Sequence, residues 1–82
     1  MKIKWDEEFG VSLCLITVGE DEFEIVVELL LGGAGRWVYT ITGDGVDFPL
    51  CSAGSYNTKE QAQHRSVIRL AKELGIKEEF EV

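Results

Sequence analysis

The hydrophobic pattern of this sequence changes its period once, and that change limits what the chain can fold into. Up to Leu50, apolar residues tend to alternate with polar ones, which is the period of β-strands. From Thr58 onward they recur at helical spacing. This order predicts an α+β protein with an antiparallel β-meander of three to five strands within residues 2–51 and one C-terminal helix packed on one face of the sheet.

The expected strands are separated by turn signals. Alternation is clearest in residues 9–18, 22–31 and 36–42. The run Gly32-Gly33-Ala34-Gly35 permits the positive φ angles of a tight reversal, and Gly43-Asp44-Gly45 gives another turn. Pro49 lacks an amide donor, so the strand around Val46, Phe48 and Leu50 is an edge or very short. Residues 2–5 also alternate and predict one more short strand.

The helix has signals at both ends. Thr58 and Gln61 have the spacing of a capping box, and Gly75 is placed to end the helix. Between them lies an apolar stripe of Val67, Leu70, Ala71 and Leu74. We expect a helix over about residues 58–74, a short acidic tail over 76–82, and a single domain over 1–82.

Alternation also assigns the strand residues to two faces. The face toward the helix is expected to hold Phe23, Ile25, Val27, Leu29, Trp37, Tyr39, Ile41, Val46, Phe48 and Leu50. The opposite face is expected to collect Cys14, Ile16, Val18, Val26, Leu30 and Val38. Scattered apolar residues on a surface need no partner, but a contiguous patch predicts a protein partner or a homodimer, and both interpretations stay open.

The charge balance disfavours nucleic acid and membranes as partners. Eight Lys and Arg face fifteen Asp and Glu, so the net charge is −7, whereas nucleic-acid affinity rests mainly on neutralising phosphates. The exception is a basic ridge formed at helical spacing by Arg65, Arg69 and Lys72. This ridge is a solvated helix face, a nucleic-acid contact or a contact for an acidic protein.

Nothing in the sequence indicates a membrane span or a secretory signal. The longest apolar run, Ile25 to Leu31, is interrupted by Glu28 and is far shorter than the ~20 residues that cross a bilayer. The N-terminus leads into acidic residues rather than an apolar stretch. We therefore expect a cytoplasmic protein, in which Cys14 and Cys51 are buried or half-buried apolar residues.

The sequence offers no convincing catalytic or metal site. Cys51 and His64 are the only conceivable nucleophile and base, with Asp44 or Asp47 to orient the base, and their spacing matches no known signature. One histidine and two distant cysteines do not make a zinc site. The glycine run joins two strands, whereas phosphate-binding loops lead from a strand into a helix. No catalytic residue, metal or cofactor is expected.

Two family resemblances are confined to the C-terminal half. The stretch Gly54-Ser55-Tyr56-Asn57-Thr58-Lys59-Glu60-Gln61-Ala62 resembles the Gly…Thr-x-Glu-Glu-Ala transition from meander to helix in HicB-type antitoxins, which implies a domain that binds and occludes a toxic ribonuclease. The strand-then-helix order also resembles the latter part of double-stranded-RNA-binding domains. Of their basic helix start this sequence keeps Lys59 and Ala62, with Glu60 and Gln63 in place of the other lysines, so this resemblance ranks lower.

These observations favour a small non-enzymatic binding or regulatory protein, bacterial or phage-borne, that acts through protein contact or self-association. The first alternative is an acidic inhibitor of the antitoxin or nucleic-acid-mimic type, whose carboxylates stand in for phosphates. The second alternative is an RNA-binding module.

Overall fold

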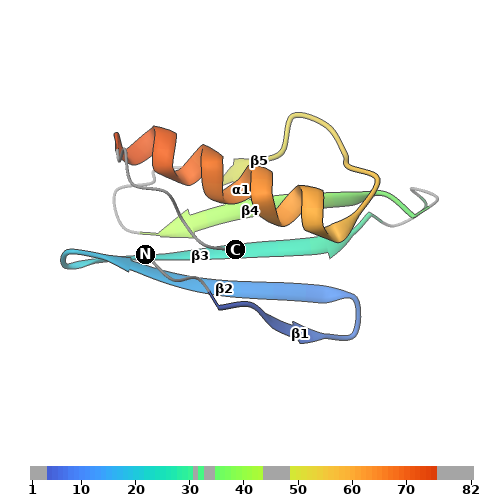
Figure 1. Cartoon of the computed structure of the whole chain (residues 1–82), viewed down its shortest axis with the longest axis horizontal. Helices are drawn as coiled ribbons and strands as arrows, with labels where there is room; N and C mark the ends of the chain where they lie inside the picture. Colours follow the sequence, from blue (N-terminus) through green and yellow to red (C-terminus); the bar gives the residue numbers. More distant parts are fainter. Residues whose placement is uncertain (1–3, 31, 33–34, 44–48, 76–82) are drawn as a thin grey trace.

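The computed structural model describes residues 4–30, 32, 35–43 and 49–75, which form one antiparallel sheet and one helix. The sheet has five strands in chain order: β1 (Asp6–Glu8), β2 (Val11–Val18), β3 (Asp21–Leu29), β4 (Trp37–Gly43) and β5 (Leu50–Cys51). The helix α1 (Lys59–Leu74) packs on β3 and β4, while β1 and β2 extend beyond it at the far edge of the sheet (Figure 1). The predicted α+β meander with one C-terminal helix is confirmed.

The first alternating segment, residues 9–18, begins with a reversal that the sequence pattern did not predict. Phe9 and Gly10 form a two-residue turn that places Glu8 of β1 opposite Val11 of β2. Both turn residues have positive φ, 44° for Phe9 and 77° for Gly10, as in the type I′ turns that suit hairpins. Of the short strand expected over residues 2–5, residues 4 and 5 are not in a strand, and residues 2 and 3 lie outside the described part.

A second two-residue turn, Gly19-Glu20, reverses the face assignment of β2. It pairs Val18 with Asp21, so Cys14 lies opposite Ile25 and Ile16 lies opposite Phe23. Directly opposite residues of an antiparallel pair share a face, so the even-numbered side chains of β2 lie on the side of the odd-numbered side chains of β3.

The expected position of three apolar residues on the uncovered face is therefore wrong. Cys14 and Ile16 are buried in the core under the helix, and Val18 packs against that core. The prediction kept the even-numbered residues of both strands on one face. The two-residue turn instead pairs even-numbered residues of β2 with odd-numbered residues of β3.

The core lies between the sheet and α1. Its buried apolar residues are Cys14, Ile16, Phe23, Ile25, Val27, Tyr39, Ile41, Ala62, Val67 and Leu70. Trp37 and Leu50 are half-buried at its margin, and Leu29 is largely exposed although alternation placed it inside. Val46 and Phe48, which were also expected here, lie outside the described residues.

The ends of α1 agree with the expected signals. The Thr58 hydroxyl accepts a 3.2 Å hydrogen bond from the backbone amide of Gln61, and the Gln61 side-chain oxygen accepts one from the amide of Asn57. At the other end Gly75, with a φ of 68°, donates its amide to the carbonyls of Ala71 and Lys72.

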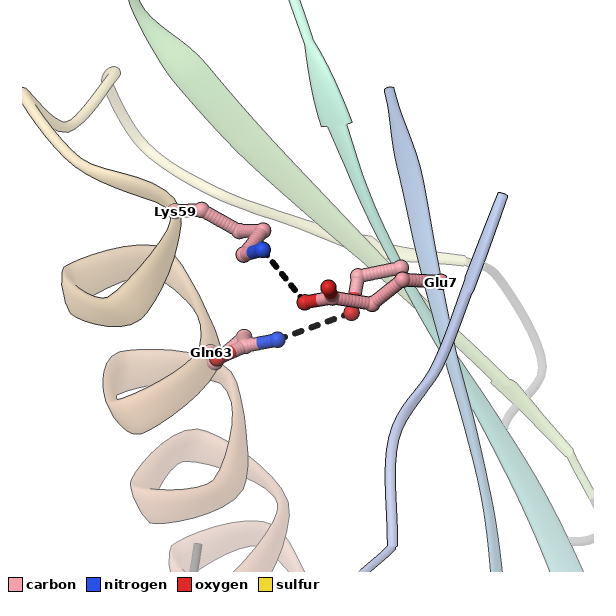
Figure 2. Close-up of polar contacts among 4 residues, drawn as sticks. Glu7, Lys59 and Gln63 are labelled. Atoms are coloured by element: carbon pink, nitrogen blue, oxygen red, sulfur yellow. Dashed lines mark hydrogen bonds and ion pairs between the residues drawn. The ribbon is translucent and has the colours of Figure 1, made fainter. Parts of the chain in front are cut away.

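Two polar contacts join the helix to the first two strands. The Gln63 side-chain amide donates a 2.8 Å hydrogen bond to the hydroxyl of Ser12, and Lys59 forms an ion pair with Glu7 (Figure 2). Glu7 lies opposite Ser12 in the β1–β2 pair, so both acceptors point to the helix side. These contacts attach β1 and β2 to the helix, which otherwise packs mainly on β3 and β4.

The connection between β5 and α1 is fixed to the start of β4. The Arg36 guanidinium donates hydrogen bonds to the Ser55 hydroxyl at 2.9 Å, to the Ser55 carbonyl at 2.7 Å and to the side chain of Asn57. Trp37 and Tyr56 exchange two backbone hydrogen bonds of 2.8 Å. The residues before the helix are thereby held in place.

Candidate functional site

The face of the sheet opposite α1, here called the outer face, carries no other helix or strand within the described residues. The pairing register assigns to it Asp6, Glu8, Val11, Leu13, Leu15, Thr17, Glu22, Glu24, Val26, Glu28, Val38, Thr40, Thr42 and Cys51. The arrangement of these residues differs from that of an ordinary solvated sheet face, because the apolar residues and the acidic residues are concentrated on different strands.

The apolar residues of the outer face are concentrated on β2. Leu15 is 76% exposed and Leu13 is 36% exposed, while Val11 is half-buried. Val26 lies directly opposite Leu13 and widens the row at its centre. We call Val11, Leu13 and Leu15 the apolar stripe.

Carboxylates border the apolar stripe on both sides. On β1, Asp6 lies opposite Leu13 and Glu8 opposite Val11. On β3, the outward-facing acidic residues are Glu22, Glu24 and Glu28. No Lys or Arg occupies a paired strand position of the outer face. The face therefore presents an apolar centre between two acidic rows.

Phe9 extends this stripe past the end of the strand. Its side chain is 97% exposed at the tip of the β1–β2 hairpin. A shallow hollow beside the hairpin is lined by Asp6, Glu7, Glu8, Phe9, Val11 and Leu13, so Phe9 adjoins the stripe and its acidic border. A bulky residue with positive φ is uncommon, because Gly, Asn and Asp adopt this conformation with less strain.

The structure brings together only part of the patch predicted from the sequence. Val26 and Val38 are half-buried on the outer face, and Leu30 is 41% exposed just beyond β3. Cys14, Ile16 and Val18 face the helix instead. The sequence pattern did not predict Leu13, Leu15 or Phe9 on this face. A two-residue turn at Gly19-Glu20, had it been recognised, places the two leucines on it.

The predicted basic ridge is partly engaged within the molecule. Arg69 pairs with Glu73 at 3.4 Å, and hydrogen bonding to Tyr39 and to Glu73 raises the pKa of the Arg69 guanidinium. The ring of Tyr39 stacks on that of Tyr56 with centroids 6.2 Å apart, and burial and Tyr39 raise the pKa of the Tyr56 phenol. Arg65 and Lys72 are exposed.

The conceivable catalytic pair is not assembled. Cys51 lies opposite Thr40 on the outer face, whereas His64 is exposed on the helix that covers the other face. Burial raises the pKa of the Cys14 thiol to about 11, so this thiol is protonated at neutral pH. The described residues contain no cluster of His, Cys, Asp and Glu that could hold a metal ion. They also contain no helix with the length and hydropathy of a membrane span.

Comparisons with known proteins supply no relative from which a role could be transferred. No family model matches the chain, and neither a curated protein nor a solved structure matches it. The outer face is therefore the feature of the molecule from which a function can be inferred.

Proposed function

We propose that this protein is a non-enzymatic binding or regulatory module that contacts another protein through its outer face. The observation that carries the proposal is the exposure of Leu13 and Leu15 on a helix-free face whose carboxylates lie on the neighbouring strands β1 and β3. An apolar centre with a polar rim is the usual arrangement of a protein interface. Exposed apolar patches with polar borders mark such sites in soluble proteins.

The acidic rows favour a foreign, basic partner over self-association. In a two-fold contact each copy would present the same face, so the carboxylates of β1 and β3 would meet carboxylates. Like charges brought together across an interface oppose binding. A partner with Lys and Arg around an apolar centre complements both the apolar stripe and the carboxylates beside it. A foreign partner is therefore favoured over a homodimer.

An acidic inhibitor of the antitoxin or nucleic-acid-mimic type is the second candidate. The same carboxylate rows and the net charge of −7 support it, because they could replace phosphates on a basic target. A phosphate mimic has no need of exposed leucines between its charges, so the first candidate ranks higher. RNA binding ranks below both, since the acidic rows repel phosphate.

Site-specific photo-crosslinking in producing cells tests the proposal. A benzoylphenylalanine at Leu15 should give an adduct with another protein, whereas one at His64, exposed on the helix, should not. An adduct of about twice the 9.2 kDa chain mass would show that the partner is a second copy of this chain and not a foreign protein. Equal adducts from both positions, or none from Leu15, would contradict the assignment of the outer face.

A further inference from the structure

We infer that the partner segment bound by the outer face is a basic amphipathic α-helix that lies along β2, with Phe9 as its anchor at one end. This inference rests on the proposed function and specifies the partner. Three features of the outer face point to this partner: the width of the apolar stripe, its length and the conformation of Phe9.

The width of the face fits one helix. Neighbouring strands lie about 4.8 Å apart, so the acidic rows on β1 and β3 are separated by about 10 Å across β2. This distance matches the diameter of an α-helix with its side chains, about 10–12 Å. A helix over the apolar stripe would place the side chains of one flank above Asp6 and Glu8 of β1 and those of the other flank above Glu24 and Glu28 of β3. Lys and Arg on both flanks complement those rows.

The length of the stripe sets the length of the helix. From Val11 to Leu15 the strand covers about 13 Å, and Phe9 at the hairpin tip extends the surface by a few ångströms, which together correspond to about three helical turns. Apolar residues at intervals of three and four on one side of such a helix contact the stripe. Recognition of an amphipathic helix by an apolar surface is a recurring mode of peptide binding. An added β-strand is less suited, because it would pair at a sheet edge, and the β1 edge is entirely acidic.

Phe9 has the properties of an anchor residue. Its ring is almost fully exposed, at a turn position whose φ of 44° favours Gly, Asn or Asp. Aromatic side chains supply much of the binding energy at interfaces. Phe9 lies at the tip of the β1–β2 hairpin, a strand pair at the edge of the sheet beyond β3 and β4, on which α1 packs (Figure 1).

The test uses the full chain and a designed peptide of about 14 residues, helical, with leucines along one side and lysines on both flanks. Its control has the same composition in scrambled order, so that the leucines surround the helix. Isothermal titration at physiological salt should show micromolar binding of the designed peptide and binding at least about tenfold weaker for the control. Equal affinities would reduce the interaction to general charge attraction and overturn the inference.

Variants of the protein locate the contact. Phe9→Asn and Leu15→Ser should each weaken peptide binding by about tenfold, whereas Ile68→Ser, which removes an exposed apolar residue of α1, should not change it. Unfolding midpoints of all three variants show that they are folded. If Phe9→Asn binds the peptide with unchanged affinity, Phe9 is not an anchor residue. If Leu15 crosslinks a cellular protein but the designed peptide does not bind, the helix inference fails and the proposed function stands. If Leu15 gives no adduct, the proposed function fails.

Discussion

The side-chain amide of Gln63 in α1 donates a 2.8 Å hydrogen bond to the hydroxyl of Ser12 in β2, and both side chains are buried. Ser12 lies between Val11 and Leu13, the first two residues of the apolar stripe. The bond therefore connects the helix on one face to the strand that carries the candidate site on the other. With the Glu7–Lys59 ion pair, it holds the β1–β2 hairpin in position relative to the helix.

Ser12→Ala should lower the free energy of unfolding by about 1–3 kcal/mol, because it leaves the buried Gln63 amide without its acceptor. Adding Gln63→Leu should recover part of this loss, since both polar groups are then removed. Urea denaturation measures both effects. A double variant no more stable than Ser12→Ala would show that the hydrogen bond is not the cause.

Truncation to alanine of two side chains of similar size tests which face of the sheet each residue occupies. Ile25→Ala should cost about 2–5 kcal/mol of stability, because Ile25 is completely buried in the core. Leu15→Ala should change stability by less than about 0.5 kcal/mol, because that side chain is 76% exposed. Comparable losses in the two variants would mean that the outer face is covered in solution.

The sequence predicted the helix and the order of the strands better than it predicted their faces. The limits of α1 depend on local chemistry at Thr58, Gln61 and Gly75, which is readable residue by residue. The face of Cys14 depends instead on whether the β2–β3 loop has an even or odd number of residues. Alternation within one strand contains no information about that number.

The candidate site was therefore only partly predictable. Exposed apolar residues on an uncovered sheet face were expected, but the parity change exchanged Cys14 and Ile16 for Leu13 and Leu15. Phe9 was placed in a strand, because an aromatic residue is typical of strands and unusual in a turn with positive φ. The acidic rows became visible only when the register placed β1 and β3 on the two sides of β2.

The buried Cys14 should make stability depend on pH in the alkaline range. Burial raises the pKa of its thiol from 9.0 to about 11, so above pH 9 the unfolded chain loses a proton that the folded protein retains. Stability from this group is complete below pH 9 and is lost as the pH rises toward 11. Cys14→Ala should flatten the stability profile over this interval.

Thiol labelling gives a second readout of the same residue. Ellman's reagent should modify the exposed Cys51 rapidly in the folded protein and Cys14 only at the rate of unfolding. Rapid modification of both thiols under native conditions would contradict the position of Cys14 in the core.

Gly43 allows a close approach of β4 to β3. A Cβ atom at this position would lie 2.4 Å from the carbonyl oxygen of Glu22 and 2.8 Å from the Cα of Phe23. Gly43→Ala should therefore destabilise the protein by more than about 2 kcal/mol. Gly54→Ala is the matched control, because a Cβ there meets no atom within 4 Å, and thermal unfolding should barely change. Similar midpoints for the two variants would show that the strand pair tolerates a side chain at Gly43.

Replacing Phe9 should make the isolated protein more stable. The φ of 44° strains a bulky side chain, whereas Asn adopts this conformation readily and is common in type I′ turns. The ring is 97% exposed, so its removal loses little packing. Phe9→Asn should therefore raise the free energy of unfolding by about 1 kcal/mol in urea titrations. Gly10→Ala, which puts a side chain at a φ of 77° in the same turn, should lower it by a similar amount. A less stable Phe9→Asn variant would mean that the aromatic ring supports the fold, and the reason to regard it as a residue kept for binding would be lost.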